Sequence, residues 1–78
     1  MAIEVLVGRN VRRLRKGREM TQEGLAERAE VSQQYVSDLE RGRNNPTILQ
    51  LQKLATALGV RPHELLLEPP KRSSAQNT

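Results

Sequence analysis

Apolar residues recur at helical spacing in several segments of the chain, and short polar stretches separate these segments. In the first segment, Val7, Val11 and Leu14 share one face, with Ile3 one turn earlier. This spacing predicts an amphipathic helix over residues 3–17. Arginine and lysine residues cover most of the remaining surface, so this helix has one apolar side and one basic side.

Hydroxyl side chains precede two further short helical segments. Thr21 and Ser32 are good N-cap residues, because a side-chain oxygen at that position accepts a free backbone N–H of the first turn. The third helix should run from Ser32 to about Arg41 and stop at Gly42. The positions expected to face inward in these two helices are Leu25, Ala26, Ala29, Val36 and Leu39. The outward positions of the third helix carry short hydrogen-bonding side chains, namely Gln33, Gln34, Ser37 and Asp38.

The pattern predicts a fourth helix capped by Thr47 and a short fifth helix that begins near Pro62, a residue favoured in a first turn. The expected buried stripe of the fourth helix comprises Ile48, Leu51, Leu54, Ala55 and Leu58. Residues 68–78, EPPKRSSAQNT, have no apolar periodicity and are expected to form a disordered tail after one domain over residues 1–67. No segment has the alternation of a strand, so the predicted fold class is all-α with five helices.

The charge balance favours a polyanionic partner. The chain carries 13 Lys and Arg against 9 Asp and Glu, for a formal net charge of +4 and a sequence pI near 10.4. Nucleic acid is the commonest soluble polyanion that such a surface binds. A core this small supplies only about 3–5 kcal/mol, so tight packing or dimerisation is expected to add stability.

Several classes of protein are disfavoured by what the sequence lacks. Without cysteine, the chain has no disulfide and no thiolate metal site, and we expect neither a metal nor a cofactor. The single histidine, His63, has no carboxylate pair or nucleophile near it in sequence, so an enzyme is not expected. No signal peptide and no apolar run near the roughly 20 residues of a membrane span are present, which predicts a cytoplasmic protein without a membrane partner.

The stretch TQEGLAERAEVSQQYVSDLERG, residues 21–42, resembles the helix-turn-helix of the Cro/phage-repressor (XRE-type) regulators. The segments VRRLRKGREM and NNPTILQLQKLATALGV resemble the family's first and fourth helices and follow in the right order and spacing. The similarity spans about residues 7–66. It implies a five-helix lambda-repressor-like DNA-binding domain, with the second and third helices as the helix-turn-helix.

Details of the resemblance bear on packing. Ala26 stands where the two motif helices cross closely, and a larger side chain would overpack that crossing. Glu30 stands where the family usually has a left-handed glycine, and a non-glycine residue there costs roughly 1 kcal/mol. Arg15 and Glu40 resemble the family's partly buried ion pair, although both residues could instead be solvated surface charges.

The resemblance also assigns DNA contacts. The third helix, residues 32–41, would enter the major groove, where a glutamine can grip adenine N6 and N7 together. The expected base contacts are Gln33, Gln34, Ser37 and Asp38. For Asp38, which could accept from cytosine N4, the alternative is that its charge only repels phosphates. The expected contacts to the DNA backbone are Gln22, Tyr35, Arg41, Arg43, Asn44 and Asn45. For Tyr35 the alternatives are a thymine methyl, or a ring that lies over the helix surface.

Family members usually bind palindromic DNA as two-fold dimers. The expected dimer interface is Leu65, Leu66 and Leu67, with Ile3, Val5 and Leu6 as an alternative, unless these residues only close the monomer core. The resemblance thus predicts a homodimeric, sequence-specific transcription regulator that binds double-stranded DNA and has no small-molecule ligand domain. Controllers of restriction–modification systems, phage repressors and antitoxins fit this pattern. The alternative function is a protein-interaction module with the same fold and little specific DNA binding.

Overall fold

The computed structural model describes residues 1–69 of the chain, and within them every regular element is helical. The elements are the α-helices α1 (Ile3–Gly17), α2 (Gln22–Ala29), α3 (Gln33–Glu40) and α4 (Ile48–Leu58), and the 3-10 helix η1 (Pro62–Leu66). The predicted all-α class is confirmed, and the expected fifth helix has the tighter 3-10 form. Glu68 and Pro69, the described part of the predicted tail, lie in no helix or strand, and the rest of that prediction lies outside the described residues.

Hydroxyl caps fix where three of the helices begin. Thr21, Ser32 and Thr47 each accept a backbone N–H from the third residue that follows, as the sequence predicts. At Thr47 the cap is reciprocal, because the side chain of Gln50 accepts the backbone N–H of Thr47 in return. At the other end of α4, Gly59 takes the left-handed conformation that ends a helix.

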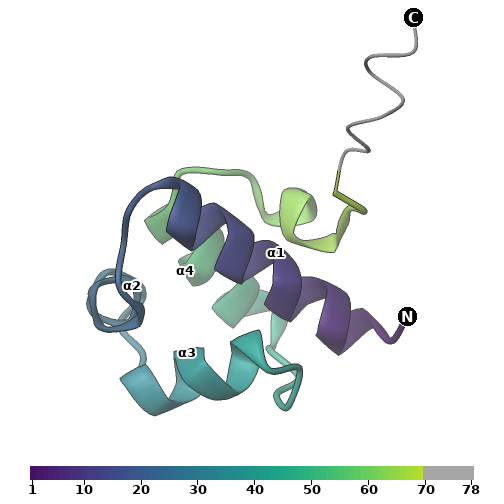
Figure 1. Cartoon of the computed structure of the whole chain (residues 1–78), viewed down its shortest axis with the longest axis horizontal. Coiled ribbons are helices and arrows are strands. Elements are labelled where there is room, and N and C mark those ends of the chain that lie inside the picture. The colour runs from purple at the N-terminus through teal and green to yellow at the C-terminus, as the bar shows by residue number, and fades with distance from the viewer. Residues whose placement is uncertain (70–78) are drawn as a thin grey trace, which may run out of the picture.

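The helices enclose one apolar core (Figure 1). Helix α1 packs against α3, α4 and η1, and α2 packs against α3 and α4. In Figure 1, α2 lies at one end of the molecule, and η1 lies at the other end with the N-terminus of α1. The fully buried large side chains are Leu25, Leu39, Leu54, Leu58, Leu65, Val11, Val36 and Asn10.

Ile48 does not belong to the buried stripe of α4. Its side chain is 87% exposed, whereas Leu54, Ala55 and Leu58 on the same helix are fully buried. The expectation for Ile48 was wrong because it is the first residue of α4, and the helix meets the core only further along. Leu51, one turn later, is partly buried against the core.

The α2–α3 turn passes through a left-handed residue that is not glycine. Glu30 has φ 61° and ψ 43°, so the left-handed conformation of the family is retained. Val31 N–H then donates to Ala26 C=O at 3.0 Å, which closes the turn. Glu19, in the loop before α2, is also left-handed, with φ 58°. A left-handed non-glycine residue costs roughly 1 kcal/mol, as expected for Glu30, and the same cost applies to Glu19.

Gly8 sets how closely α1 can approach the end of α3. A Cβ atom at this position would lie 2.3 Å from the carbonyl oxygen of Leu39 and 3.1 Å from that of Glu40. Both are backbone atoms, so the contact can be relieved only if a helix moves. The absence of a side chain at Gly8 therefore allows α1 to lie this close to the end of α3.

Candidate nucleic-acid interface

Helix α3 presents hydrogen-bonding side chains on the side that faces away from the core. Gln33 and Gln34 are exposed, and Ser37 and Asp38 are partly exposed. Val36 and Leu39, on the opposite side, are fully buried. The four side chains predicted to read bases are thus all accessible to a ligand in the free protein.

Two of these side chains already contact each other. Gln34 Nε2 donates to Asp38 Oδ1 at 3.0 Å, one turn along the exposed surface. A base that replaced Asp38 as the acceptor for Gln34 would free a carboxylate oxygen at the same time. A DNA contact made by one of these two residues therefore also changes the hydrogen bonding of the other.

A nearly buried ion pair joins α1 to the end of α3. Arg15 Nε donates to Glu40 Oε2 at 2.6 Å and Arg15 Nη2 donates to Glu40 Oε1 at 3.0 Å. The two side chains are 10% and 3% exposed. The hydrogen bond to Glu40 raises the pKa of Arg15, so the guanidinium stays charged. The ion-pair prediction is confirmed, and solvated surface charges are not what the structure shows.

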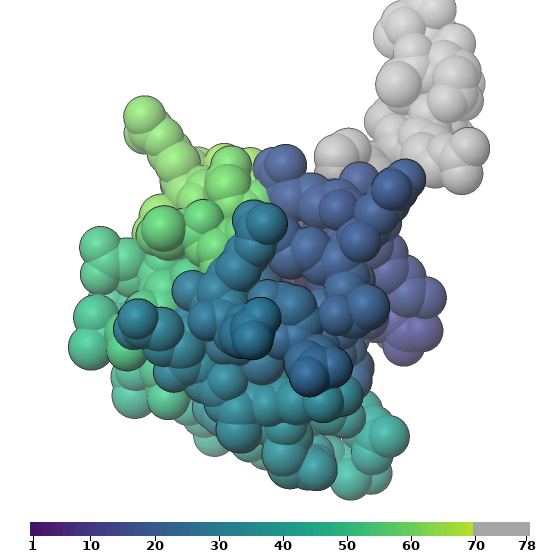
Figure 2. Space-filling view, turned by 90° about the vertical axis from the view of Figure 1, so that its left-hand side faces the viewer, coloured from purple at the N-terminus to yellow at the C-terminus, as the bar shows by residue number. Residues whose placement is uncertain are grey.

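The same carboxylate reaches the start of α2. Gln22 Nε2 donates to Glu40 Oε1 at 3.1 Å, and Arg15 Nη1 donates to the carbonyl oxygen of Met20 at 2.8 Å. Figure 2 views the molecule from the side of α2, whose blue-teal residues form the front of that view. Gln22, the residue expected to contact a phosphate, is partly buried and held by Glu40.

The loop after α3 combines exposed cations with one anchored amide. Arg41, Arg43 and Asn45 are exposed, as contacts to a DNA backbone require. Asn44 is partly buried, and its Nδ2 donates to the carbonyl oxygen of Tyr35 at 3.2 Å. Asn44 thus holds the loop against α3.

A family model described as helix-turn-helix matches residues 11–65 of the chain. The match includes α2, α3 and the turn between them, and also the whole of α4. The chain belongs to the XRE-type helix-turn-helix family. Its resemblance to this family, expected from the motifs, is confirmed.

Relatives of this helix-turn-helix protein include regulators of transcription and controllers of restriction–modification. The uncharacterized HTH-type transcriptional regulator y4dJ of Sinorhizobium fredii is 52% identical over 66 residues, which are 85% of this chain and 86% of the relative. Control protein C.BamHI of Bacillus amyloliquefaciens is 40% identical over 65 residues, 82% of this chain and 80% of the relative. The crystal structure of the controller protein C.AhdI from Aeromonas hydrophila matches with a TM-score of 0.77 and 39% identity, over 80% of this chain and 94% of that one. The family is one of transcription regulators and not of enzymes.

Tyr35 of this helix-turn-helix protein is bound within the domain. Its hydroxyl donates to Gln50 Oε1 at 2.7 Å, and the ring is partly buried against the core. Burial raises the pKa of Tyr35, so the phenol keeps its proton. A phosphate oxygen can only accept a hydrogen bond, so the predicted phosphate contact requires Tyr35 to give up its bond to Gln50. Sequence reasoning identified Tyr35 but missed Gln50.

The three leucines expected at a dimer interface divide between the core and the surface. Leu65 is fully buried, so it closes the monomer core, and the interface prediction was wrong for this residue. Leu66 is 42% exposed and Leu67 is 52% exposed. Leu65 is drawn inward because η1 packs against both α1 and α4.

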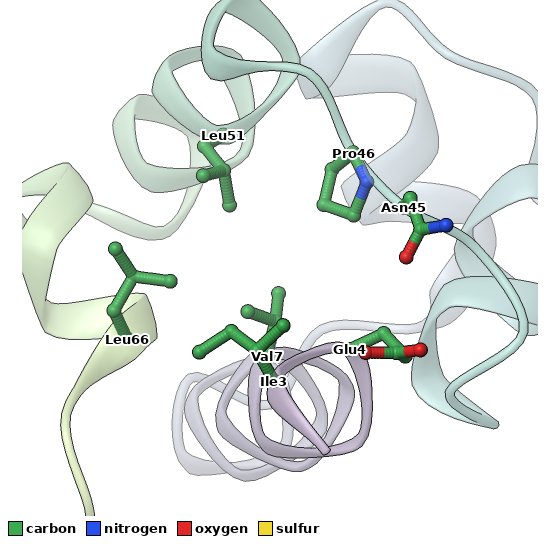
Figure 3. Close-up of a pocket in the computed structure, with 7 residues that line it drawn as sticks. All are labelled: Ile3, Glu4, Val7, Asn45, Pro46, Leu51 and Leu66. Carbon is green, nitrogen blue, oxygen red and sulfur yellow. The ribbon is translucent and has the colours of Figure 1, made fainter.

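Leu66 also lines an apolar pocket at the side of the molecule (Figure 3). The pocket has a volume of about 200 Å³ and lies between α1, α4, η1 and the loop before α4. Its lining residues are Ile3, Glu4, Val7, Asn45, Pro46, Leu51 and Leu66. Ile48, which protrudes from the start of α4, follows two residues after Pro46 in the chain.

A buried polar residue that sequence reasoning missed secures η1. Asn10 is fully buried on α1, and its Nδ2 donates to the carbonyl oxygens of Leu65 and Leu67, both at 2.8 Å. Arg13 Nη2 donates to its Oδ1 at 3.2 Å, so Arg13 has a partner within the domain. The signal was an amide one turn before Leu14 on an apolar face, but its acceptors lie more than 50 residues away.

In residues 1–69, no helix is both long and apolar enough to cross a membrane.

Proposed function

We propose that this chain is a sequence-specific DNA-binding regulator of transcription that acts as a homodimer on a palindromic operator. In this proposal residues 1–67 form the DNA-binding domain, α2 and α3 are its helix-turn-helix, and α3 enters the major groove. The observation that carries the proposal is the accessible row of Gln33, Gln34, Ser37 and Asp38 on α3. Gln22 on one side and the exposed cations of residues 41–45 on the other supply contacts to the DNA backbone.

Selection of bound sequences from a random DNA pool tests this proposal directly. The expected result is enrichment of one sequence with two inverted half-sites about one helical turn apart. Affinity for that sequence should fall steeply as salt rises, because phosphate contacts release counterions. No enrichment over random DNA would instead favour the alternative of a protein-interaction module with the same fold.

The glutamines of α3 should govern which sequence is bound. Replacing Gln33 or Gln34 by alanine is expected to weaken binding to the selected site by about 1–3 kcal/mol for each half-site, because a bidentate base contact is lost in each. Binding to random DNA should change little. Titrations of both DNAs, followed by fluorescence anisotropy, measure the difference. Equal losses on both DNAs would remove the two residues from the base contacts.

Arg43 is expected to contribute equally to the binding of all DNA sequences. The variant Arg43→Ala is expected to weaken selected and random DNA together and to lower the salt slope of binding by about one unit for each bound subunit, or about two units for the dimer. Titrations over a series of salt concentrations give this slope. Arg61→Ala is a matched control, because Arg61 is also exposed but lies just before η1 and is not among the residues proposed to contact DNA. An unchanged slope for Arg43→Ala would show that Arg43 contacts no phosphate.

The proposed dimer contact uses the exposed leucines beside the apolar pocket, Leu66 and Leu67. Leu66→Lys is expected to shift a dimer towards monomers, since a charge would have to be buried at the contact. Sedimentation velocity measures this shift, and circular dichroism checks that the monomer stays folded. The affinity for a two-half-site operator should fall with the dimer fraction. An unchanged dimer would place the interface elsewhere.

A further inference from the structure

The carboxylate of Glu40 accepts hydrogen bonds from two residues on different helices. Arg15 donates from Nε at 2.6 Å and from Nη2 at 3.0 Å, and Gln22 donates from Nε2 at 3.1 Å. The Glu40 side chain is only 3% exposed, whereas Gln22 is partly exposed. This network therefore runs from the interior, through Glu40, to a side chain at the surface.

Gln22 has more hydrogen-bonding capacity than Glu40 uses. A carboxamide nitrogen carries two N–H groups, and the bond to Glu40 Oε1 takes one of them. A side chain held at one N–H has lost most of its rotational freedom, so a second bond from the same nitrogen costs little further entropy. Gln22 is thus oriented before any ligand arrives.

The network can lie close to DNA without repelling it. Arg15 pairs with Glu40 through two hydrogen bonds, so the two charges cancel next to Gln22. An unpaired carboxylate beside Gln22 would repel a phosphate bound by Gln22 and so weaken DNA binding. The ion pair thus has a second consequence besides joining α1 to α3.

We propose that Glu40 is a positioning residue for DNA binding, which holds the Gln22 carboxamide so that its second N–H donates to a backbone phosphate. The inference rests on the proposed function and goes beyond it, because it gives the buried pair a role in affinity as well as in stability. A purely structural pair would leave the DNA affinity of any folded variant unchanged.

The test compares the effect of Gln22→Ala in two backgrounds, the native chain and the double variant Arg15→Met with Glu40→Leu. The double variant removes both charges together, and replacing a buried pair by apolar residues of similar size is often neutral for folding. Thermal unfolding by circular dichroism checks that each variant is folded. Affinity is measured with the DNA selected from the random pool.

In the native background, Gln22→Ala is expected to weaken binding about tenfold for each half-site, the usual effect of losing one hydrogen bond to a charged group. The double variant alone should show a similar loss, and Gln22→Ala should then add less than about a twofold change to it, because coupled residues are not additive. Equal tenfold losses in both backgrounds would overturn the positioning role and leave the phosphate contact intact. No loss in the native background would overturn both the contact and its positioning, while the base contacts of α3 would still stand.

Gln22→Asn gives a second test that leaves the ion pair untouched. Asparagine retains the carboxamide but is one methylene shorter, so it cannot span Glu40 and a phosphate together. The expected affinity equals that of Gln22→Ala, with unchanged thermal stability. Native-like affinity for Gln22→Asn would overturn the inference even if the double variant failed to fold.

Discussion

Replacing Glu40 by leucine alone is expected to leave a large fraction of the protein molecules unfolded at room temperature. The substitution leaves the Arg15 guanidinium, 10% exposed, without its carboxylate. An uncompensated buried charge costs about 3–5 kcal/mol. A core of this size supplies a similar amount, about 3–5 kcal/mol, so little net stability remains.

Thermal and urea unfolding followed by circular dichroism measure this loss. The matched control is Glu40→Leu combined with Arg15→Met, which removes the second charge and should restore most of the lost stability. If the single and double variants were equally stable, the guanidinium would not depend on Glu40. Raising the pH is not expected to release the pair, because the raised pKa of Arg15 keeps it charged until the solution is strongly alkaline.

Gly8→Ala should have the second-largest effect on stability. Alanine normally stabilises a helix interior by about 1 kcal/mol relative to glycine. At Gly8, however, the added Cβ would lie 2.3 Å from the backbone oxygen of Leu39, and overpacking of this kind typically costs about 1–3 kcal/mol. We expect a net destabilisation towards the upper part of that range, because only a shift of α1 or α3 can relieve the contact.

Gly17→Ala is the control on the same helix. A Cβ at Gly17 would meet nothing within 4 Å, so this variant should be unchanged or slightly more stable. If the close contact between α1 and α3 decides the outcome, chemical unfolding should give a lower free energy of unfolding for Gly8→Ala and an equal or higher one for Gly17→Ala. A stabilising Gly8→Ala would mean that the two helices can separate at little cost.

The sequence predicted well what depends on local chemistry. The caps at Thr21, Ser32 and Thr47 were found because each needs only a hydroxyl and the backbone N–H of the residue three positions on. The left-handed backbone at Glu30 and the pair of Arg15 with Glu40 came from the family resemblance, and the structure shows both.

Features that depend on distant partners were misjudged or missed. For Leu65 the sequence left open a dimer contact or the monomer core, because its covering elements, α1 and α4, lie far from it in the chain. Asn10 offered only an amide on an apolar face and Gly8 offered no local signal, since their partners, Leu65 and Leu39, are remote in sequence. The predicted base contacts stand as the proposal above, because they depend on a ligand whose sequence the chain does not encode.

Tyr35 is the only aromatic residue of the chain, and this gives the protein a built-in optical reporter. The hydroxyl of Tyr35 on α3 donates a hydrogen bond to Gln50 on α4. Near-ultraviolet circular dichroism and intrinsic fluorescence therefore report on this contact between α3 and α4. A change in the tyrosine signal on adding DNA would therefore report a change in the surroundings of Tyr35, either at its hydrogen bond to Gln50 or by direct contact with DNA, without any label. The same property makes Tyr35→Phe a spectroscopically costly substitution, since the strongest native chromophore would be lost with the hydroxyl.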